Sequence, residues 1–238
     1  MAIVEAAHAV NLVGRLRRFA MGYELRIGMV EQLAVISVQG ADSNTALSRA
    51  GMPLPAPQAL STARRADADV FTLRLRETAA DGAWLVVPRA QAAPVLHKLD
   101  NTVDEKMMEA ARIVYGFPRF GVDWDEHVHP LNANLVERRG VSFDKGCYVG
   151  QEVTSRMHWR KAVKRGLYRV RLRETPGPLP VDIRTAARVG VLSSLARSPD
   201  GQYLGIASLP VTIAEAGREL RAGDHSPVEI LGPCPGLD

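Results

Sequence analysis

The apolar pattern of this 238-residue chain changes near residue 162, and no other feature of the sequence constrains the fold as strongly. Beyond that point, short apolar segments at residues 166–172, 187–192 and 203–209 alternate with turns. Several short strands at this spacing are typical of a small all-β domain or a closed barrel. The sequence therefore predicts two domains, residues 1–162 and a small C-terminal β-barrel at residues 163–238.

The first domain combines helical and strand patterns. Apolar residues at helical spacing predict a helix over residues 5–20, with arginines on its opposite face. Alternation of apolar and polar residues predicts a half-buried strand over residues 23–29. A nearly continuous apolar run predicts a more deeply buried strand at residues 33–38, and a short helix that ends at Arg49 follows it.

The rest of this domain continues the mixed pattern. Three prolines within residues 51–57 indicate a loop. The further predictions are strands at residues 70–75 and 84–87, a helix from Pro88 to Leu99, and a helix from Thr102 to Tyr115. Thr102 and Glu105 have the spacing of a capping box. The expected fold class is therefore α+β, a mixed sheet with helices followed by a barrel, although the sheet has fewer strands than such a domain should contain.

Composition limits where the chain can act. Hydrophobic residues make up 46% of the sequence, enough for a real core. No segment approaches the roughly 18 consecutive apolar residues of a membrane span. The N-terminal sequence MAIVEAAHAV lacks the pattern of a secretion signal. Two cysteines, Cys147 and Cys234, suit a reducing compartment as free thiols, with a disulfide between them as the alternative. We therefore expect a cytoplasmic protein without membrane association.

Positive charge is concentrated in residues 137–173, where 11 Lys or Arg against three acidic residues leave +8 in a chain of +4. Such a stretch can attract a polyanion such as RNA, or a ligand that carries phosphate or several glutamates. A solvated basic face on a helix and a strand explains the same charge, and no aromatic pattern for stacking on bases is interleaved there. We therefore expect no direct binding of tRNA.

The segment KGCYVGQE at residues 145–152 holds one of the two cysteines between two glycines. Gly150 precedes a helix-compatible stretch at residues 151–157, so Cys147 is expected near a helix N-terminus, with Lys145 two positions away. The positive end of a helix and a neighbouring lysine both favour the reactive thiolate. A small buried cysteine beside a tight turn is an equally good interpretation of this segment alone.

Histidines and acidic residues near the motif raise two further possibilities. A cysteine hydrolase would need a base such as His127, His129 or His158, and their spacing fixes no pair with Cys147. The segment DWDEHVH at residues 123–129 could bind a transition metal. A metal needs three or four convergent ligands, and an exposed acidic loop is the commoner explanation. We therefore predict no metal site.

Taken together, the octet KGCYVGQE, the VTSRM after it and the preceding RIVYGFPRFGVDWDEHVHPLNANL resemble the YgfZ family of folate-binding proteins. The resemblance covers nearly the whole chain. It implies a partial aminomethyltransferase-like folate-binding domain in residues 1–162, with tetrahydrofolate or a derivative as the cofactor. Members of the family usually begin with a further segment, and this chain opens at the helix that follows it, which would account for the shortage of strands.

The resemblance also implies residues that contact the folate. A carboxylate that reads the amino and amide edge of the pterin would be Glu126, with Asp123 as the second candidate. Phe120 would supply an apolar face to the ring, or would instead only pack against neighbouring side chains. Arg156 would meet the glutamate tail or the rim of the cavity, or would instead pair with Glu152 one helical turn earlier.

In the motif itself, the resemblance makes Cys147 the functionally required thiol at the cavity. Lys145 is the second catalytic candidate, and Tyr148 is a further cofactor contact. The complete motif set is Lys145, Gly146, Cys147, Tyr148, Gly150, Gln151 and Glu152.

The expected function is a folate-dependent accessory factor for iron–sulfur cluster assembly or repair that supports tRNA modification indirectly, with no assigned reaction. Its expected partners are folate, iron–sulfur assembly or client proteins, and a second copy of the chain. The alternatives are a folate-dependent aminomethyltransferase of glycine cleavage, a module that binds tRNA or another polyanion, and a degenerate remnant.

Overall fold

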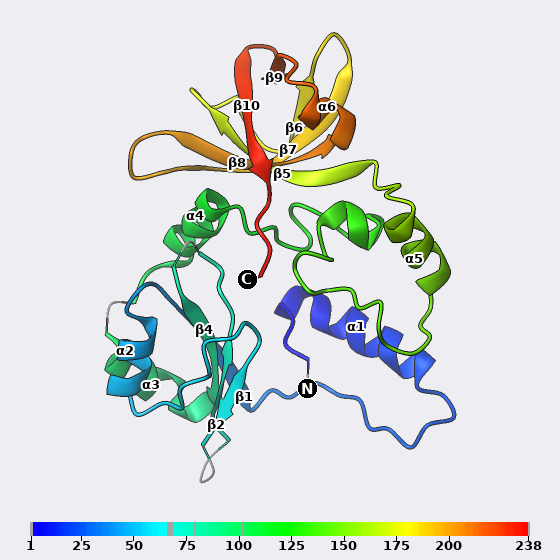
Figure 1. Cartoon of the computed structure of the whole chain (residues 1–238). Coiled ribbons are helices and arrows are strands. Elements are labelled where there is room, and N and C mark those ends of the chain that lie inside the picture. Colours follow the sequence, from blue (N-terminus) through cyan, green and yellow to red (C-terminus); the bar gives the residue numbers. More distant parts are fainter. Residues whose placement is uncertain (1, 66–68, 79, 101, 238) are drawn as a thin grey trace.

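The computed structural model describes residues 2–65, 69–78, 80–100 and 102–237 (Figure 1). The α-helices are α1 (Ala6–Phe19), α2 (Ser43–Arg49), α3 (Ala92–Leu99), α4 (Glu105–Tyr115), α5 (Gln151–Trp159) and α6 (Val211–Glu215), with 3-10 helices η1 (Arg89–Gln91) and η2 (Pro130–Ala133). The strands are β1 (Leu33–Gln39), β2 (Thr62–Arg64), β3 (Phe71–Arg74), β4 (Gly82–Pro88), β5 (Arg165–Leu172), β6 (Val181–Arg184), β7 (Arg188–Arg197), β8 (Tyr203–Pro210), β9 (Leu220–Ala222) and β10 (Ser226–Pro233). None of the described helices has the length and apolar character needed to cross a bilayer.

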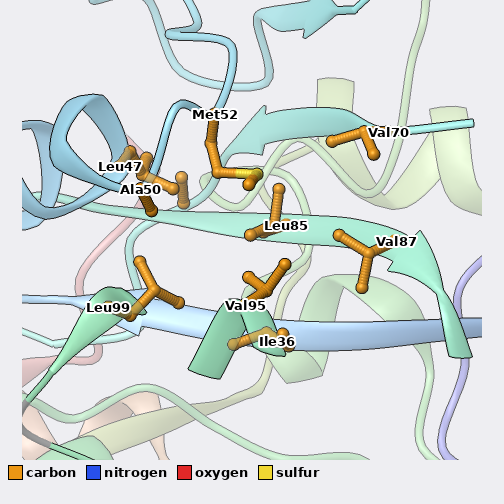
Figure 2. Packing of buried hydrophobic residues seen from close by; sticks show 10 residues of the cluster. Ile36, Leu47, Ala50, Met52, Val70, Leu85, Val87, Val95 and Leu99 are labelled. Carbon is orange, nitrogen blue, oxygen red and sulfur yellow. The ribbon is translucent and has the colours of Figure 1, made fainter. Parts of the chain in front are cut away.

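The first part of the chain is built around an antiparallel sheet in the order β1-β4-β3-β2. β4 is buried along most of its length because strands pair with it on both sides and α2 and α3 pack nearby. Its Leu85 and Val87 belong to a cluster that the two helices complete (Figure 2). The other labelled members of the cluster are Ile36, Leu47, Ala50, Met52, Val70, Val95 and Leu99. The strands and helices predicted between residues 33 and 99 are therefore confirmed, and β2 is an addition.

The C-terminal part is a closed antiparallel barrel of six strands, in the order β10-β5-β8-β7-β6-β9 (Figure 1). Its interior holds the buried side chains of Val170, Ile183, Leu192, Leu209 and Leu220. At Gly205 of β8 a Cβ would lie 2.6 Å from the carbonyl oxygen of Ser194, so only glycine permits this approach of β7. The predicted barrel is confirmed. β6, β9 and β10 were not predicted. β6 and β9 have only four and three residues, too few to show alternation, whereas β10 contains two prolines and a glycine that obscure its strand pattern.

Residues 23–29 do not form the strand that their alternation predicts. This segment connects α1 to β1 without regular structure, and its Tyr23, Leu25 and Met29 are 72%, 64% and 50% exposed. Alternating side chains stabilise a strand only where one face is buried, and the described residues supply no partner strand here. A second copy of the chain would cover such apolar groups, and this homodimer stays a prediction.

Three details of the predicted elements also change. β1 is an edge strand rather than a deeply buried one, and only its Ile36 is buried. α4 begins at Glu105 rather than Thr102, because the Asp104 side chain caps it by accepting from the Met107 N–H at 2.7 Å. The barrel strands begin at Arg165, and the domain boundary at residue 162 stays a prediction.

Candidate functional site

The motif KGCYVGQE forms the loop that leads into α5. Gly150 occupies the N-cap position with φ = 87°, in the left-handed region that favours glycine. The loop closes where the Gln151 N–H donates to the Tyr148 carbonyl oxygen at 3.1 Å, and the Tyr148 N–H donates to the Gln151 side-chain oxygen at 3.3 Å. Gly146 has neither a positive φ nor a neighbour within 4 Å of an added Cβ. Of the two glycines around the cysteine, the backbone therefore requires only Gly150.

The side chains of this loop differ in exposure. Cys147 is exposed and Cys234 is buried, and both are free, so the buried interpretation of Cys147 and the disulfide alternative are both wrong. The Nζ atom of Lys145 lies 4.6 Å from the centroid of the Tyr148 ring. The Tyr148 hydroxyl is buried and has no hydrogen-bond partner within the described residues. The loop thus presents one accessible thiol beside one cation and one unsatisfied hydroxyl.

Asp123 is fully buried, and donors from three elements surround its carboxylate. Its Oδ2 accepts from Arg112 of α4 at 2.8 Å and from the backbone N–H of Arg119 at 2.9 Å. Its Oδ1 accepts from the hydroxyls of Ser193 and Ser194 in β7, at 2.7 and 2.6 Å. Both oxygens therefore have partners in the protein, and contact between Asp123 and a pterin stays a prediction.

Ion pairs extend this network to the N-terminal helix. Arg112 also pairs with Glu109 at 2.5 Å. Arg119 pairs with Glu109 at 3.1 Å and with Glu5, which precedes α1, at 2.9 Å. The hydrogen bond from Arg112 lowers the pKa of Glu109, so this carboxylate stays ionised in the folded protein. The buried Asp123 is thus the centre of a network that joins α1, α4 and the barrel.

Phe120 lies in the same loop and packs against other rings rather than facing open space. Its ring meets His8 of α1 at 4.8 Å and Trp124 at 4.9 Å, in edge-to-face geometry in both cases. Glu126 is exposed and makes no hydrogen bond or ion pair within the described residues. The structure therefore gathers Phe120 and Asp123 into the packed part of the loop and leaves Glu126 on its outside.

Arg156 of α5 forms the ion pair that its spacing indicates. It contacts Glu152, four residues earlier, at 2.5 Å, with 59% and 81% of the two side chains exposed. His158 stacks on Phe143 with the ring centroids 4.0 Å apart. Within the described residues, Cys147 forms no hydrogen bond with a histidine. Among all the residues that the structure describes, no group of three or more His, Cys, Asp or Glu side chains is placed to hold a metal ion.

The residues that sequence reasoning missed are the partners of Asp123. Ser193 and Ser194 lie 70 and 71 positions further along the chain, and Arg112 lies 11 positions before it. Only the packing of the barrel against α4 brings these groups together. A serine pair within a barrel strand carries no sequence signal for such a role.

Comparisons with known proteins place the chain among relatives that are longer than it is. No family model matches the chain. A tRNA-modifying protein YgfZ of Yersinia pseudotuberculosis is 30% identical over 161 residues, which are 66% of this chain and 48% of that protein. The mitochondrial iron–sulfur cluster assembly factor IBA57 of Mus musculus is 32% identical over 112 residues, 44% of this chain and 30% of that protein. The chain thus spans about half the length of the YgfZ proteins it matches.

A solved structure identifies the fold. The glycine cleavage system aminomethyltransferase T from Bartonella henselae superposes with a TM-score of 0.79, over 95% of this chain and 65% of that one. The sequence identity of 20% means that this match shows a shared fold alone. It confirms the aminomethyltransferase-like fold with its C-terminal barrel. The sequence relatives agree with the resemblance to the YgfZ family over part of the chain, and the solved structure shows the fold.

Proposed function

We propose that the chain is a folate-dependent accessory factor for iron–sulfur cluster assembly or repair, which supports tRNA modification indirectly and uses Cys147 as its reactive thiol. The observation that carries this proposal is the exposure of Cys147 in a loop that ends at the N-cap of α5. The names of the relatives, a tRNA-modifying protein and an iron–sulfur cluster assembly factor, point to the same process.

The surroundings of Cys147 suit contact with an anionic partner group. The N-terminus of α5 carries backbone N–H groups without helical partners and the positive end of the helix dipole. Lys145 adds a full positive charge on the same loop. A single cysteine is too few for a conventional iron–sulfur site with four ligands. We therefore infer that the thiol acts on a cluster or sulfur species that an assembly or client protein holds, with no reaction of its own assigned.

The proposed cofactor is tetrahydrofolate or a derivative. The Tyr148 hydroxyl, buried without a partner among the described residues, is available to hydrogen-bond a ligand. Glu126 is the better candidate for the pterin edge, because Asp123 already accepts four hydrogen bonds. Phe120 stays the proposed apolar contact, and Arg156 would have to exchange Glu152 for a ligand carboxylate.

Calorimetric titration with 5-formyltetrahydrofolate tests this cofactor. Glu126→Gln is expected to weaken binding about tenfold or more, because a charge-assisted hydrogen bond contributes roughly 1.5–3 kcal/mol. Glu219→Gln, the same change at an exposed residue of the barrel part, should bind like the unchanged protein. Equal affinity of all three proteins would remove Glu126 from the site.

Complementation tests the function. In a strain that lacks its own YgfZ protein, Cys147→Ala and Cys147→Ser are expected to leave iron–sulfur enzyme activity at the level of the empty vector. Cys234→Ala is the matched control, because it removes the other thiol, which is buried against Ala133, Leu167 and Ile206. Full restoration of activity by Cys147→Ala, at equal protein level, would exclude the thiol from the function.

The proposal does not include direct binding of tRNA, although residues 137–173 are rich in positive charge. Several arginines of this stretch are not free to meet a polyanion. Arg138 is buried, Arg165 and Arg169 donate to backbone carbonyls, and Arg156 and Arg171 pair with Glu152 and Glu229. The exposed charge that remains is smaller than the sequence total indicates.

A further inference from the structure

The C-terminal tail returns from the barrel toward the first part of the chain (Figure 1). A small cavity lies beside the end of this tail. After β10, the Cys234 N–H donates to the Leu167 carbonyl oxygen at 2.9 Å and the Leu237 N–H donates to that of Glu137 at 3.2 Å. Leu237 then forms part of the wall of this cavity, and the cavity has a volume of about 250 Å³. The remaining lining residues are Pro57, Ala59, Arg74, Leu75, Arg76 and Asp81.

The two arginines in this wall differ in their partners. Arg74 donates to the carbonyl oxygen of Pro55 and to the side chain of Asn44, each at 3.0 Å, and pairs with Asp81. Its donors are therefore used, and the charge of Asp81 is balanced. Arg76 forms no ion pair within the described residues, and its buried Nε has no hydrogen-bond partner. Its guanidinium lies 5.4 Å from the centroid of the Tyr115 ring.

A second unpaired arginine lies behind the tail. Arg138 is 9% exposed and its guanidinium lies 3.5 Å from the centroid of the Phe117 ring. It donates to the carbonyl oxygen of Pro235 at 3.2 Å, and no carboxylate pairs with it among the described residues. Burial lowers the pKa of Arg138 to about 10, and Arg138 contacts the same tail that brings Leu237 into the cavity wall.

Arg76 in the wall of the cavity, with Arg138 behind the tail that completes this wall, indicates that a ligand supplies the missing charge. A buried cation without a counter-charge is expensive, and a buried donor without an acceptor costs about 1–3 kcal/mol. An aromatic ring against the face of a guanidinium leaves its edge donors free, and this edge matches the two oxygens of a carboxylate or phosphate. The volume admits one small anion or the end of a larger ligand.

We propose that Arg76, assisted by Arg138, binds an oxyanion, a carboxylate or phosphate group, in the cavity that Arg74 and Leu237 help to line. None of the lining residues belongs to the motif loop or to the loop that holds Phe120 and Glu126. The site is therefore separate from Cys147 and does not depend on the proposed function.

Calorimetric titration of the full chain with succinate, and separately with inorganic phosphate, at constant ionic strength tests this site. At least one of the two anions is expected to bind, and Arg76→Gln should weaken that binding about tenfold or more, as loss of a charge-assisted hydrogen bond predicts. Arg173→Gln is the matched control: it removes the same charge from the wall of a different cavity, on the barrel, and should keep the affinity.

Two more variants separate the proposed contacts from general electrostatics. Arg76→Lys keeps the charge without the guanidinium fork and should bind with intermediate affinity. Arg138→Met should weaken binding while the melting temperature in anion-free buffer stays equal or rises, because an apolar chain replaces an unpaired buried cation. Failure of both anions to bind, or equal losses in Arg76→Gln and Arg173→Gln, would overturn the proposal. Unchanged affinity in Arg138→Met would remove Arg138 from it.

The source of the oxyanion is settled by a further pair of titrations. If Arg76→Gln weakens binding of 5-formyltetrahydrofolate as well as that of the small anions, the cavity receives a carboxylate of that ligand. If it weakens only the small anions, the cavity is a site for a free anion. Either result supports an oxyanion at Arg76.

Discussion

Cys147 and Cys234 have the same side chain and opposite surroundings. Cys147 is exposed in the motif loop, whereas Cys234 is 2% exposed and packs with Ala133, Leu167 and Ile206. Burial raises the pKa of the Cys234 thiol from 9.0 to about 12, so this thiol stays protonated at neutral pH. Because the folded-state pKa is raised, the stabilisation from the neutral thiol is complete below pH 9.0 and is lost as the pH rises toward 12.

This contrast predicts the labelling of the native protein. At mildly alkaline pH, one thiol per chain is expected to react with a maleimide reagent, and the second only after unfolding, because the thiolate is the reactive form and needs access. Mass spectrometry of the labelled chain should show that Cys147→Ala abolishes native-state labelling and Cys234→Ala preserves it. Rapid modification of Cys234 in the folded protein would contradict this assignment.

At the scale of elements, the start of α5 depends on one backbone conformation. Gly150 adopts φ = 87° and places the motif loop ahead of the helix, and Thr154 in the first turn donates to its carbonyl oxygen at 2.9 Å. Glu152, also in the first turn, has the charge that the positive helix end favours. The position of Cys147 ahead of α5 therefore depends on Gly150, the second glycine of the motif, and not on Gly146.

Substitution of each glycine tests this difference. Gly150→Ala is expected to lower the free energy of unfolding by about 1–2 kcal/mol, because an alanine at positive φ is strained even where its Cβ meets no neighbour. Gly146→Ala should change it by less than about 0.5 kcal/mol, as for other unconstrained surface positions. Urea unfolding followed by circular dichroism measures both, and equal losses would show that the loop needs both glycines.

At the scale of the whole molecule, a buried charge network joins the barrel to the part that precedes it. Asp123 receives donors from α4, from its own loop and from β7, and Arg119 continues the network to Glu5. The C-terminal tail adds a second connection, in which the Leu237 N–H bonds to the Glu137 carbonyl oxygen. These contacts set the barrel and the helices relative to the motif loop.

Removal of the central carboxylate should loosen this junction. Asp123→Ala is expected to lower the free energy of unfolding by about 3–5 kcal/mol, because Arg112 loses its fully buried partner. Asp224→Ala, at an exposed barrel turn, is the matched control and should change it by less than about 0.5 kcal/mol. Thermal and urea unfolding measure the difference, and a small effect of Asp123→Ala would show that the network does not stabilise the junction.

The local pattern of apolar residues predicts an element correctly where that element buries one face against its immediate neighbours. Such local patterns correctly predict several elements: the helix at residues 5–20, strand β4, and the barrel strands at residues 166–172 and 203–209. The same rule failed at residues 23–29, because alternation records a side chain's chemistry and not whether a sheet lies beside it.

The sequence by itself determined the α+β class, the C-terminal barrel and the motif KGCYVGQE that carries the resemblance to the YgfZ family, because these depend on side chains near one another in the chain. Only the tertiary structure decided which charged groups are paired. It enclosed Asp123 among donors up to 71 positions away, exposed Cys147 and buried Cys234. Among the described residues it also left Arg76, in the wall of a cavity, and Arg138, behind the C-terminal tail, without carboxylate partners. The physical reason is that burial and charge compensation depend on contacts between distant segments, which periodicity does not encode.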